Sequence, residues 1–382
     1  MPGSAAAWSG HGNGFINEVT AVATNPYTKL PAEAYWRTGV ARHAGSGRVL
    51  KGLWRPGAGI SSGHGFLTVG SCFAQHIGRA LAGAGLNRML VERAPGFLPA
   101  SMHEGFGFGV FSFRVGNVYT AAMLLQWLRW ARDPASQDRE VWSDGTVFFD
   151  PVRPGIEPGG FETVEDLLAA RDATLAAMRR GIAEADVLIF TLGLTEMWVT
   201  ADTGLVLASC PGTQAGTFDA ERHRFANAGF ASVSRDLEQI RAILREMNPD
   251  IRLLLTVSPV PLTATAEPGA HVLVSTVQSK SILRAAAGEM ARNHDDVDYF
   301  PSYEIVSHPA LAIDMFEADR REVRRDAVAL VMRHFLDGLG VAQVGIDAPE
   351  APDTAMQERI DQALAQGDAV CDDLELDRFN DH

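Results

Sequence analysis

The stretch "GFLTVGSCFAQH" (65–76) decides the fold that the sequence predicts. Residues 66–69 form a short apolar run that is typical of a buried strand. After this run, apolar residues recur at helical spacing, at Phe73, Ile77, Leu81 and Ala84. Ser71 is therefore expected on a tight turn between a strand and a helix, where a side chain can serve as a nucleophile.

Two further apolar runs predict strands that are covered on both faces, as in a parallel sheet. They begin the stretches "VLIFTLGLTEMW" (187–198) and "RLLLTVSPVPLT" (252–263). Helical periodicity is found at 119–131, 164–185, 231–247 and 279–293. The alternation indicates an α/β fold with a doubly wound, mostly parallel sheet and helices on both faces. Ligands of such sheets bind at the carboxyl ends of the strands.

Composition and charge exclude some classes of protein. The chain has 382 residues, 46% of them hydrophobic, and a net charge of −14. Eleven acidic and two basic residues fall within 345–382, so this tail carries most of the excess negative charge. No cluster of Lys and Arg suits a phosphate backbone, and we expect no nucleic-acid partner.

The cysteines and the termini predict the compartment and the domain limits. Cys72, Cys210 and Cys371 are scattered, which argues against a disulfide framework or a structural zinc site and fits a reducing cytoplasm. Neither a signal peptide nor a membrane span is expected. We expect an N-terminal extension (1–24), an α/β domain (25–340) and an acidic tail (341–382), with an insertion at 200–230, centred on 215–229, that could act as a lid.

Several motifs occur in the order in which a known family has them. The string "GSCFAQHI" resembles the motif that names the GSCFA family, which is similar to SGNH, or GDSL-like, hydrolases. Six further stretches resemble the same family: "NPYTKLPAEAYW" (25–36), "FRVGNVYTA" (113–121), "FFDPVRPG" (148–155), "LGLTEMW" (192–198), "TVSPVPLTAT" (256–265) and "YFPSYE" (299–304). The resemblance covers roughly residues 25–335.

The resemblance implies roles for individual residues. Ser71 matches the nucleophilic serine, and Gly116 matches the glycine whose N–H faces the oxyanion. The third block, usually Gly-x-Asn-Asp, reads Gly-Leu-Thr-Glu at 193–196, so Thr195 replaces the asparagine donor. In the final Asp-x-x-His element, Asp319 matches the aspartate, while Glu322 stands in place of the histidine.

The missing histidine leaves the general base open, because a serine hydroxyl needs a neighbouring group to take its proton. His308 is the first candidate, since it follows an apparent strand in the connection where the family's histidine would lie. His271 is the second candidate. Glu196, Glu304 and Glu322 are further candidates, because a carboxylate buried at a strand end can have a raised pKa.

The residues expected to contact the substrate are Cys72, Asn117, Trp198, His271 and Glu304. The combined prediction is a serine esterase or O-acyltransferase that acts on an O-acyl ester, with an acylated saccharide favoured by the resemblance. It has no metal and no cofactor, because no cluster at ligand spacing and no nucleotide-binding loop is found. Two alternatives stay open. Ser71 could simply cap the following helix, and the protein could be a degenerate SGNH-fold module that binds a saccharide or a protein partner.

Overall fold

A computed structural model describes residues 25–57, 59–311, 314–341, 354–364, 375–376 and 379. Its strands are β1 (Phe66–Gly70), β2 (Trp142–Ser143), β3 (Phe148–Phe149), β4 (Val187–Leu192), β5 (Glu196–Thr200), β6 (Val206–Leu207), β7 (His223–Asn227), β8 (Arg252–Val257) and β9 (Val297–Phe300). Its α-helices are α1 (Trp36–Gly39), α2 (Ala74–Gly83), α3 (Ala121–Arg132), α4 (Val164–Glu184), α5 (Phe230–Met247), α6 (Val272–Asn293), α7 (Ser302–Ser307), α8 (Arg325–Gly338) and α9 (Thr354–Leu364). Short 3₁₀ helices are η1 (Pro26–Lys29), η2 (Ala32–Ala34), η3 (Ala41–His43), η4 (Ala100–Met102) and η5 (Pro134–Ser136).

A parallel sheet with the strand order β1-β4-β8-β9 forms the centre of the protein. Gly70 of β1 pairs with Thr191 of β4, and Thr191 pairs with Thr256 of β8. All residues of β1 and β4 are buried, as their continuous apolar sequences predict. The predicted α/β class is confirmed, and the carboxyl ends of β1 and β4 lie side by side.

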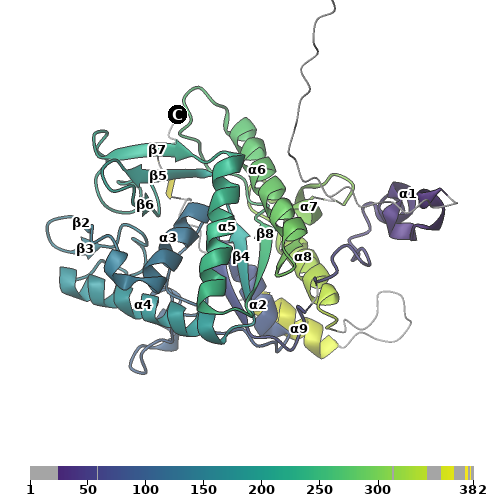
Figure 1. Ribbon diagram of the computed structural model, residues 1–382, viewed down its shortest axis with the longest axis horizontal. Coiled ribbons are helices and arrows are strands. Elements are labelled where there is room, and N and C mark those ends of the chain that lie inside the picture. The colour runs from purple at the N-terminus through teal and green to yellow at the C-terminus, as the bar shows by residue number, and fades with distance from the viewer. Residues whose placement is uncertain are drawn as a thin grey trace, which may run out of the picture.

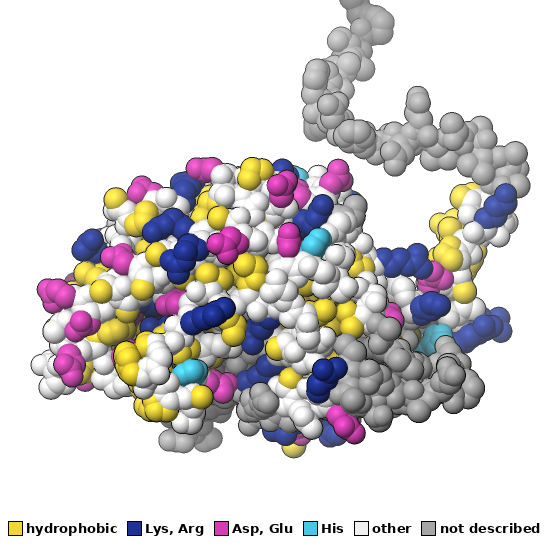
Figure 2. Space-filling view, turned by 90° about the horizontal axis from the view of Figure 1, so that it is seen from below, with side chains coloured by type: hydrophobic (Ala, Val, Ile, Leu, Met, Phe, Trp, Pro, Cys, Tyr) yellow, Lys and Arg dark blue, Asp and Glu magenta, His cyan; other side chains and the backbone are white. Residues whose placement is uncertain are grey.

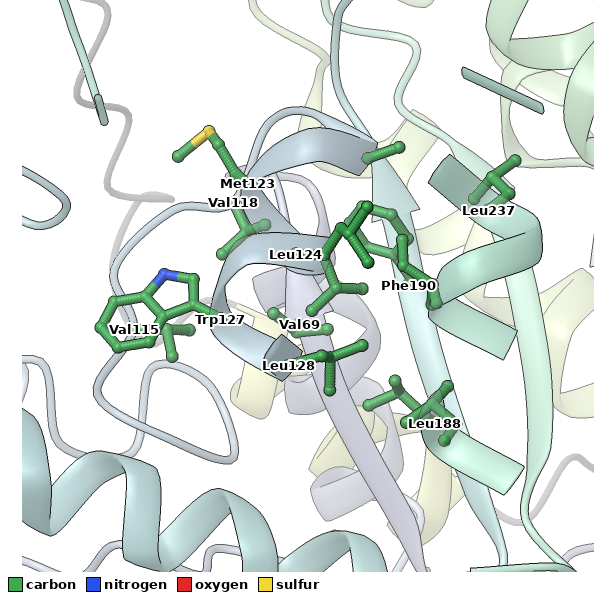
Figure 3. Packing of buried hydrophobic residues seen from close by; sticks show 14 of the residues in the cluster. Val69, Val115, Val118, Met123, Leu124, Trp127, Leu128, Leu188, Phe190 and Leu237 are labelled. Carbon is green, nitrogen blue, oxygen red and sulfur yellow. The ribbon is translucent and has the colours of Figure 1, made fainter. Parts of the chain in front are cut away.

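Alternate residues of the strands face two different apolar layers. Figure 3 shows one layer, where Val69 and Phe190 of the sheet face Leu124 and Leu128 of α3. The opposite layer takes Phe66 and Ile189 from the same strands. Helices therefore cover both faces: α3, α4, α5 and α6 contribute to the first layer, and α2, α7, α8 and α9 contribute to the second.

A small antiparallel sheet of order β6-β5-β7 follows directly from β4. Its strands β6 and β7 lie within the predicted insertion at 200–230, and β7 belongs to the 215–229 segment. Trp198 of β5 contacts Phe225 of β7, with ring centroids 5.7 Å apart. This sheet stands beside the carboxyl end of β4, where it can form the wall of a site.

The surface mixes charges of both signs. On the face seen in Figure 2, basic and acidic side chains are interspersed. Within the described ranges, no helix combines the length and the apolar character that crossing a membrane requires.

Candidate functional site

Ser71 lies on the turn between β1 and α2, as the sequence predicts. Its backbone N–H donates to the Thr191 carbonyl oxygen at 3.1 Å, which ties the turn to β4. Gly70 is required here, because its φ is +147° and a β-carbon would lie 2.5 Å from the same oxygen. The Ser71 side chain is 2% exposed, and its Oγ has no hydrogen-bond partner among the described residues. A buried hydroxyl without a partner calls for an explanation, and a catalytic role is one such explanation.

Two loops place Gly193 beside Ser71 and Tyr119 beside Gly193. A β-carbon on Gly193 would lie 3.1 Å from the Ser71 Cβ and 3.1 Å from a ring carbon of Tyr119. The Gly193 N–H donates to the Tyr119 carbonyl at 2.8 Å, and the Val118 N–H donates to the Gly70 carbonyl at 2.8 Å. The turn that carries Ser71 is thus fixed from two sides.

A lysine that the sequence analysis missed holds the same loop. Lys280 of α6 is 2% exposed, and its Nζ donates to the Gly193 carbonyl oxygen at 2.6 Å. Lys280 and Ser71 therefore share Gly193 as a neighbour. Helical spacing could have indicated this position, because Lys280 shares the buried face of α6 with Leu283 and Ala287, three and seven residues later.

A cavity of about 490 Å³ lies next to this turn. Tyr119 and Leu194, the neighbours of the Ser71–Gly193 contact, form part of its wall. Trp198, Phe218 and Phe225 give it an aromatic side, and Trp198 was predicted to contact the substrate. Leu376 and Phe379, from the acidic tail, also line it. The cavity is mostly apolar.

Glu196 is the acidic residue that lines this cavity. Burial raises the pKa of its carboxyl, while hydrogen bonds from the Thr265 hydroxyl and the Ala266 N–H act in the opposite direction. The Thr265 Oγ1 lies 2.7 Å from the Glu196 Oε1. Glu196 is therefore a polar group at the edge of an apolar space.

Thr195 occupies the position of the expected oxyanion donor, but its hydrogen bonds go elsewhere in this structure. Its N–H donates to the Ser279 Oγ at 3.0 Å, and its hydroxyl donates to the Asn227 Oδ1 at 2.7 Å. The Thr195 side chain thus stabilises the junction between β5 and β7.

Gly116 and Asn117 border a second, smaller cavity of about 150 Å³. The Asn117 Oδ1 accepts a hydrogen bond from the Gln75 Nε2 at 3.4 Å, and Gln75 lies one turn beyond Ser71. Within the described residues, the Gly116 N–H forms no hydrogen bond. The loop that carries both residues continues to Val118 and so reaches the Ser71 turn.

The structure places His308 and Glu304 at the β9 edge of the central sheet, away from β1 and Ser71. His308 is exposed, follows α7 at the β9 edge of the sheet, and contacts Trp36 with ring centroids 5.4 Å apart. Because β4 and β8 separate β1 from β9, this edge is roughly 14 Å from β1 at a strand spacing of about 4.8 Å. His271 is exposed and caps α6. Glu304 follows β9 as well and binds Arg284 and the Tyr299 hydroxyl.

Asp319 shapes an exposed turn. Its Oδ1 accepts the N–H groups of Arg321 and Glu322, both at 3.0 Å. The hydrogen bond from Arg321, together with that from Glu322, holds the pKa of Asp319 below its usual range. These contacts give Asp319 a local structural role before α8.

The expectation that the cysteines form no disulfide is wrong for Cys72. Cys72, beside Ser71, is disulfide-bonded, and its partner lies outside the described residues. Spacing along the chain does not show which cysteines meet in space, so the sequence could not reveal this bond. Cys210 has a free thiol, and burial raises its pKa to about 11, which makes it a poor nucleophile.

Within the described ranges, no group of three or more His, Cys, Asp and Glu side chains could hold a metal ion.

A comparison with curated proteins gave no match. A model of the GSCFA family matches residues 65–335, which include the Ser71 turn, the Gly193 loop and Lys280. The match covers well over half of the sequence, and the chain therefore belongs to the GSCFA family.

Proposed function

We propose that the protein is a serine esterase or O-acyltransferase whose nucleophile is Ser71. The observation that carries this proposal is the buried Ser71 hydroxyl, unpartnered among the described residues, on a turn beside Gly193, whose neighbour Tyr119 lines an apolar cavity. In the reaction, the Ser71 Oγ attacks the ester carbonyl and loses its proton to a base, and the alcohol then leaves. Water or a second hydroxyl group accepts the acyl group from the acyl-enzyme.

We assign the base to Lys280, in place of the histidine that the chain lacks. Lys280 and Ser71 share Gly193 as a neighbour, whereas His308 and Glu304 lie at the β9 edge of the sheet. Lysine can act as a general base where burial disfavours its charged form. The Gly116 N–H is the first candidate donor to the oxyanion, since the N–H of Ser71 and the hydroxyl of Thr195 bind protein acceptors.

The lining of the cavity favours an apolar acyl group over a sugar as the part of the substrate that lies inside it. Its aromatic and aliphatic wall, with Trp198, Leu194 and Met197, resembles the lining of sites for apolar ligands. Glu196 at its edge is the group that could orient a polar acceptor. An acylated saccharide remains compatible with this arrangement, with the acyl chain inside the cavity and the sugar outside.

The preference for acyl chain length tests this assignment. Each methylene group that is buried contributes about 0.8 kcal/mol, so p-nitrophenyl butyrate is expected to react with a kcat/KM about tenfold above that of the acetate. Trp198→Ala is expected to reduce this preference. The control Trp36→Ala removes an exposed tryptophan outside the cavity and should leave the preference unchanged. A kcat/KM that stays flat or falls from acetate to butyrate would contradict an acyl-binding cavity.

The role of Lys280 is tested with Lys280→Met and Lys280→Arg. Both variants are expected to react with a fluorophosphonate at Ser71 at least about a hundredfold more slowly than the wild type, because neither side chain can take a proton near neutral pH. The rise of the wild-type labelling rate with pH should also disappear. Unfolding midpoints in urea identify variants that are merely destabilised. Should the arginine variant react as fast as the wild type, Lys280 is only a structural cation.

A further inference from the structure

Residues 25–55 form an arm whose outer part has no core of its own. The elements η1, η2, α1 and η3 of this part contain no buried residue. Its shape is held by internal hydrogen bonds: the Tyr35 hydroxyl donates to the Tyr27 carbonyl oxygen, and the Thr38 hydroxyl donates to the Ala32 carbonyl oxygen. Figure 1 shows α1 set apart from the helices and strands of the central domain.

The large apolar side chains of the arm's outer part face solvent. Tyr27 is 68% exposed, and Trp36 is 60% exposed although it contacts His308. Leu30 and Tyr35 are exposed as well. In the part of the chain that the structure describes, four of the thirteen exposed large hydrophobic residues thus fall within ten consecutive positions. Exposed apolar side chains that gather in one place indicate a surface for a partner.

The arm is basic, although the chain as a whole is acidic. Residues 25–55 contain six Lys and Arg residues and one acidic residue, Glu33, so the arm has a net charge of +5. All six basic side chains are exposed, and Arg55 forms an ion pair with Glu33. Figure 2 shows basic and hydrophobic side chains close together on the projecting segment at its right side. The other five basic residues form no ion pair with any described residue: Lys29, Arg37, Arg42, Arg48 and Lys51.

We propose that the arm binds the surface of a membrane that contains anionic lipids. Trp and Tyr rings favour the boundary between headgroups and acyl chains, because they combine an apolar body with a polar edge. Lys and Arg side chains are attracted to the negative charge of such a surface. A segment that presents both kinds of side chain lies on a membrane and does not cross it. The inference goes beyond the proposed function and does not depend on it.

A bilayer suits the arm better than another anionic partner. Basic and apolar residues are neighbours in the sequence, as Lys29 is beside Leu30 and Arg37 is beside Trp36. At a membrane, a basic side chain can lay its stem against the apolar layer and keep its charge among the headgroups. A single-stranded nucleic acid stacks its bases on aromatic rings and offers no apolar layer for Leu30. Protein interfaces are depleted in Lys.

The distribution of charge also predicts how the protein is oriented on the membrane. The residues outside 25–55 carry a net charge of −19, because the whole chain carries −14 and the arm +5. An anionic surface therefore attracts the arm and repels the rest. The base of the arm is fixed to α8, since the Leu50 N–H donates to the His334 Nε2 at 2.9 Å and Trp54 stacks on Phe335. The arm thus connects the membrane to a domain that is held away from it.

The first experiment compares vesicles of two compositions with the full-length wild type. Protein is sedimented with vesicles of equal parts phosphatidylglycerol and phosphatidylcholine, or of phosphatidylcholine alone. The lipid concentration for half-maximal binding is expected to be at least about tenfold lower for the anionic vesicles. In about 0.5 M NaCl this preference should largely disappear, because salt screens exposed charges. Equal binding to both kinds of vesicle, or binding to neither, would overturn the proposal.

The second experiment removes charges from the arm. Lys29→Ala/Arg37→Ala/Arg42→Ala is expected to weaken binding to the anionic vesicles about a hundredfold, because each basic residue near such a surface contributes a factor of about five. The outer part of the arm has no buried residue, so the urea midpoint should stay that of the wild type.

A matched control removes the same number of charges from the domain. Arg139→Ala/Arg180→Ala/Arg224→Ala replaces three arginines that are also exposed, and this variant should bind the vesicles like the wild type. An equal loss of affinity in both triple variants would show that the arm is not the contact.

The aromatic residues separate a membrane from other partners. Tyr27→Ser/Trp36→Ser is expected to weaken vesicle binding at least about tenfold. Leu273→Ser/Val274→Ser, which changes an exposed apolar pair on α6, is the control and should bind normally. Single-stranded RNA that binds the wild type as tightly as the vesicles do would assign the arm to nucleic acid. A dimer that Tyr27→Ser/Trp36→Ser abolishes would assign it to a second copy of the chain. Either result would refute the membrane contact.

Discussion

Ser71→Ala is expected to lower the rate of p-nitrophenyl butyrate hydrolysis by a factor of about 10³ or more, to near the level of buffer. The substitution removes the one atom that forms the acyl-enzyme. It removes no hydrogen bond of the native state, since the Ser71 Oγ has no partner among the described residues. Stability should therefore stay close to that of the wild type. Kinetics under reducing conditions, with urea unfolding in parallel, measure both effects.

Ser258→Ala is the matched control for this experiment. Ser258 is also a buried serine that follows a strand of the central sheet, β8, and its Oγ accepts the Val260 N–H at 3.3 Å. It lies outside the Ser71–Gly193 contact, so its variant should hydrolyse the ester at nearly the wild-type rate. If Ser71→Ala keeps more than about a tenth of the activity, the nucleophile is another residue.

Asp150→Ala is expected to destabilise the protein by about 3–5 kcal/mol, the usual cost of removing one partner from a buried ion pair. Asp150 is fully buried, and its carboxylate binds Arg153 at 2.9 Å and Arg171 at 2.7 Å. Both arginines are at most 2% exposed. Without Asp150, two buried guanidinium groups lose their counter-charge. A decrease of this size should be visible in the urea midpoint at pH 7.

The dependence of stability on pH separates the contribution of the Asp150 charge from that of its packing. Burial alone would raise the pKa of Asp150, but the charges and hydrogen bonds of Arg171 and Arg153 lower it below its ordinary value of 3.8. The carboxylate therefore contributes stability that is complete above the unfolded pKa and is lost as pH falls through the folded pKa.

Asp150→Asn keeps the shape of the side chain and serves as the second variant. The difference in unfolding free energy between wild type and Asp150→Asn should be constant between about pH 5 and pH 7. It should shrink below about pH 4. A difference that does not change with pH would show that packing, and not charge, dominates.

The strands and long helices of the fold could be predicted because their apolar patterns are local. The run beginning at Val187 forms β4, and the pattern at 164–185 forms α4 almost to the residue. The start of α6 at Val272 was not predicted, because its first two turns expose Leu273, Val274 and Val277 and so lack an amphipathic pattern.

The candidate site could be predicted only where its residues lie on a strand or directly after one. Ser71 and Trp198 belong to motifs that a reader of the sequence can recognise; Trp198 lines the cavity, and Ser71 lies beside Gly193, next to the cavity wall. Lys280 comes from the middle of a helix, and the Cys72 disulfide depends on a distant segment. Such groups meet through tertiary packing, which local patterns do not encode.

The pairing of β1 with β4 also determines when this site can exist during synthesis. Ser71 and the Thr191 carbonyl that holds its turn are roughly 120 residues apart in the chain, and the strand that pairs with β1 in the central sheet is β4. A nascent chain that ends before residue 192 leaves one edge of β1 without this partner strand. Such non-local pairing slows folding and leaves edges open to aggregation. The Ser71 turn can therefore form only after residues 187–192 have been synthesised.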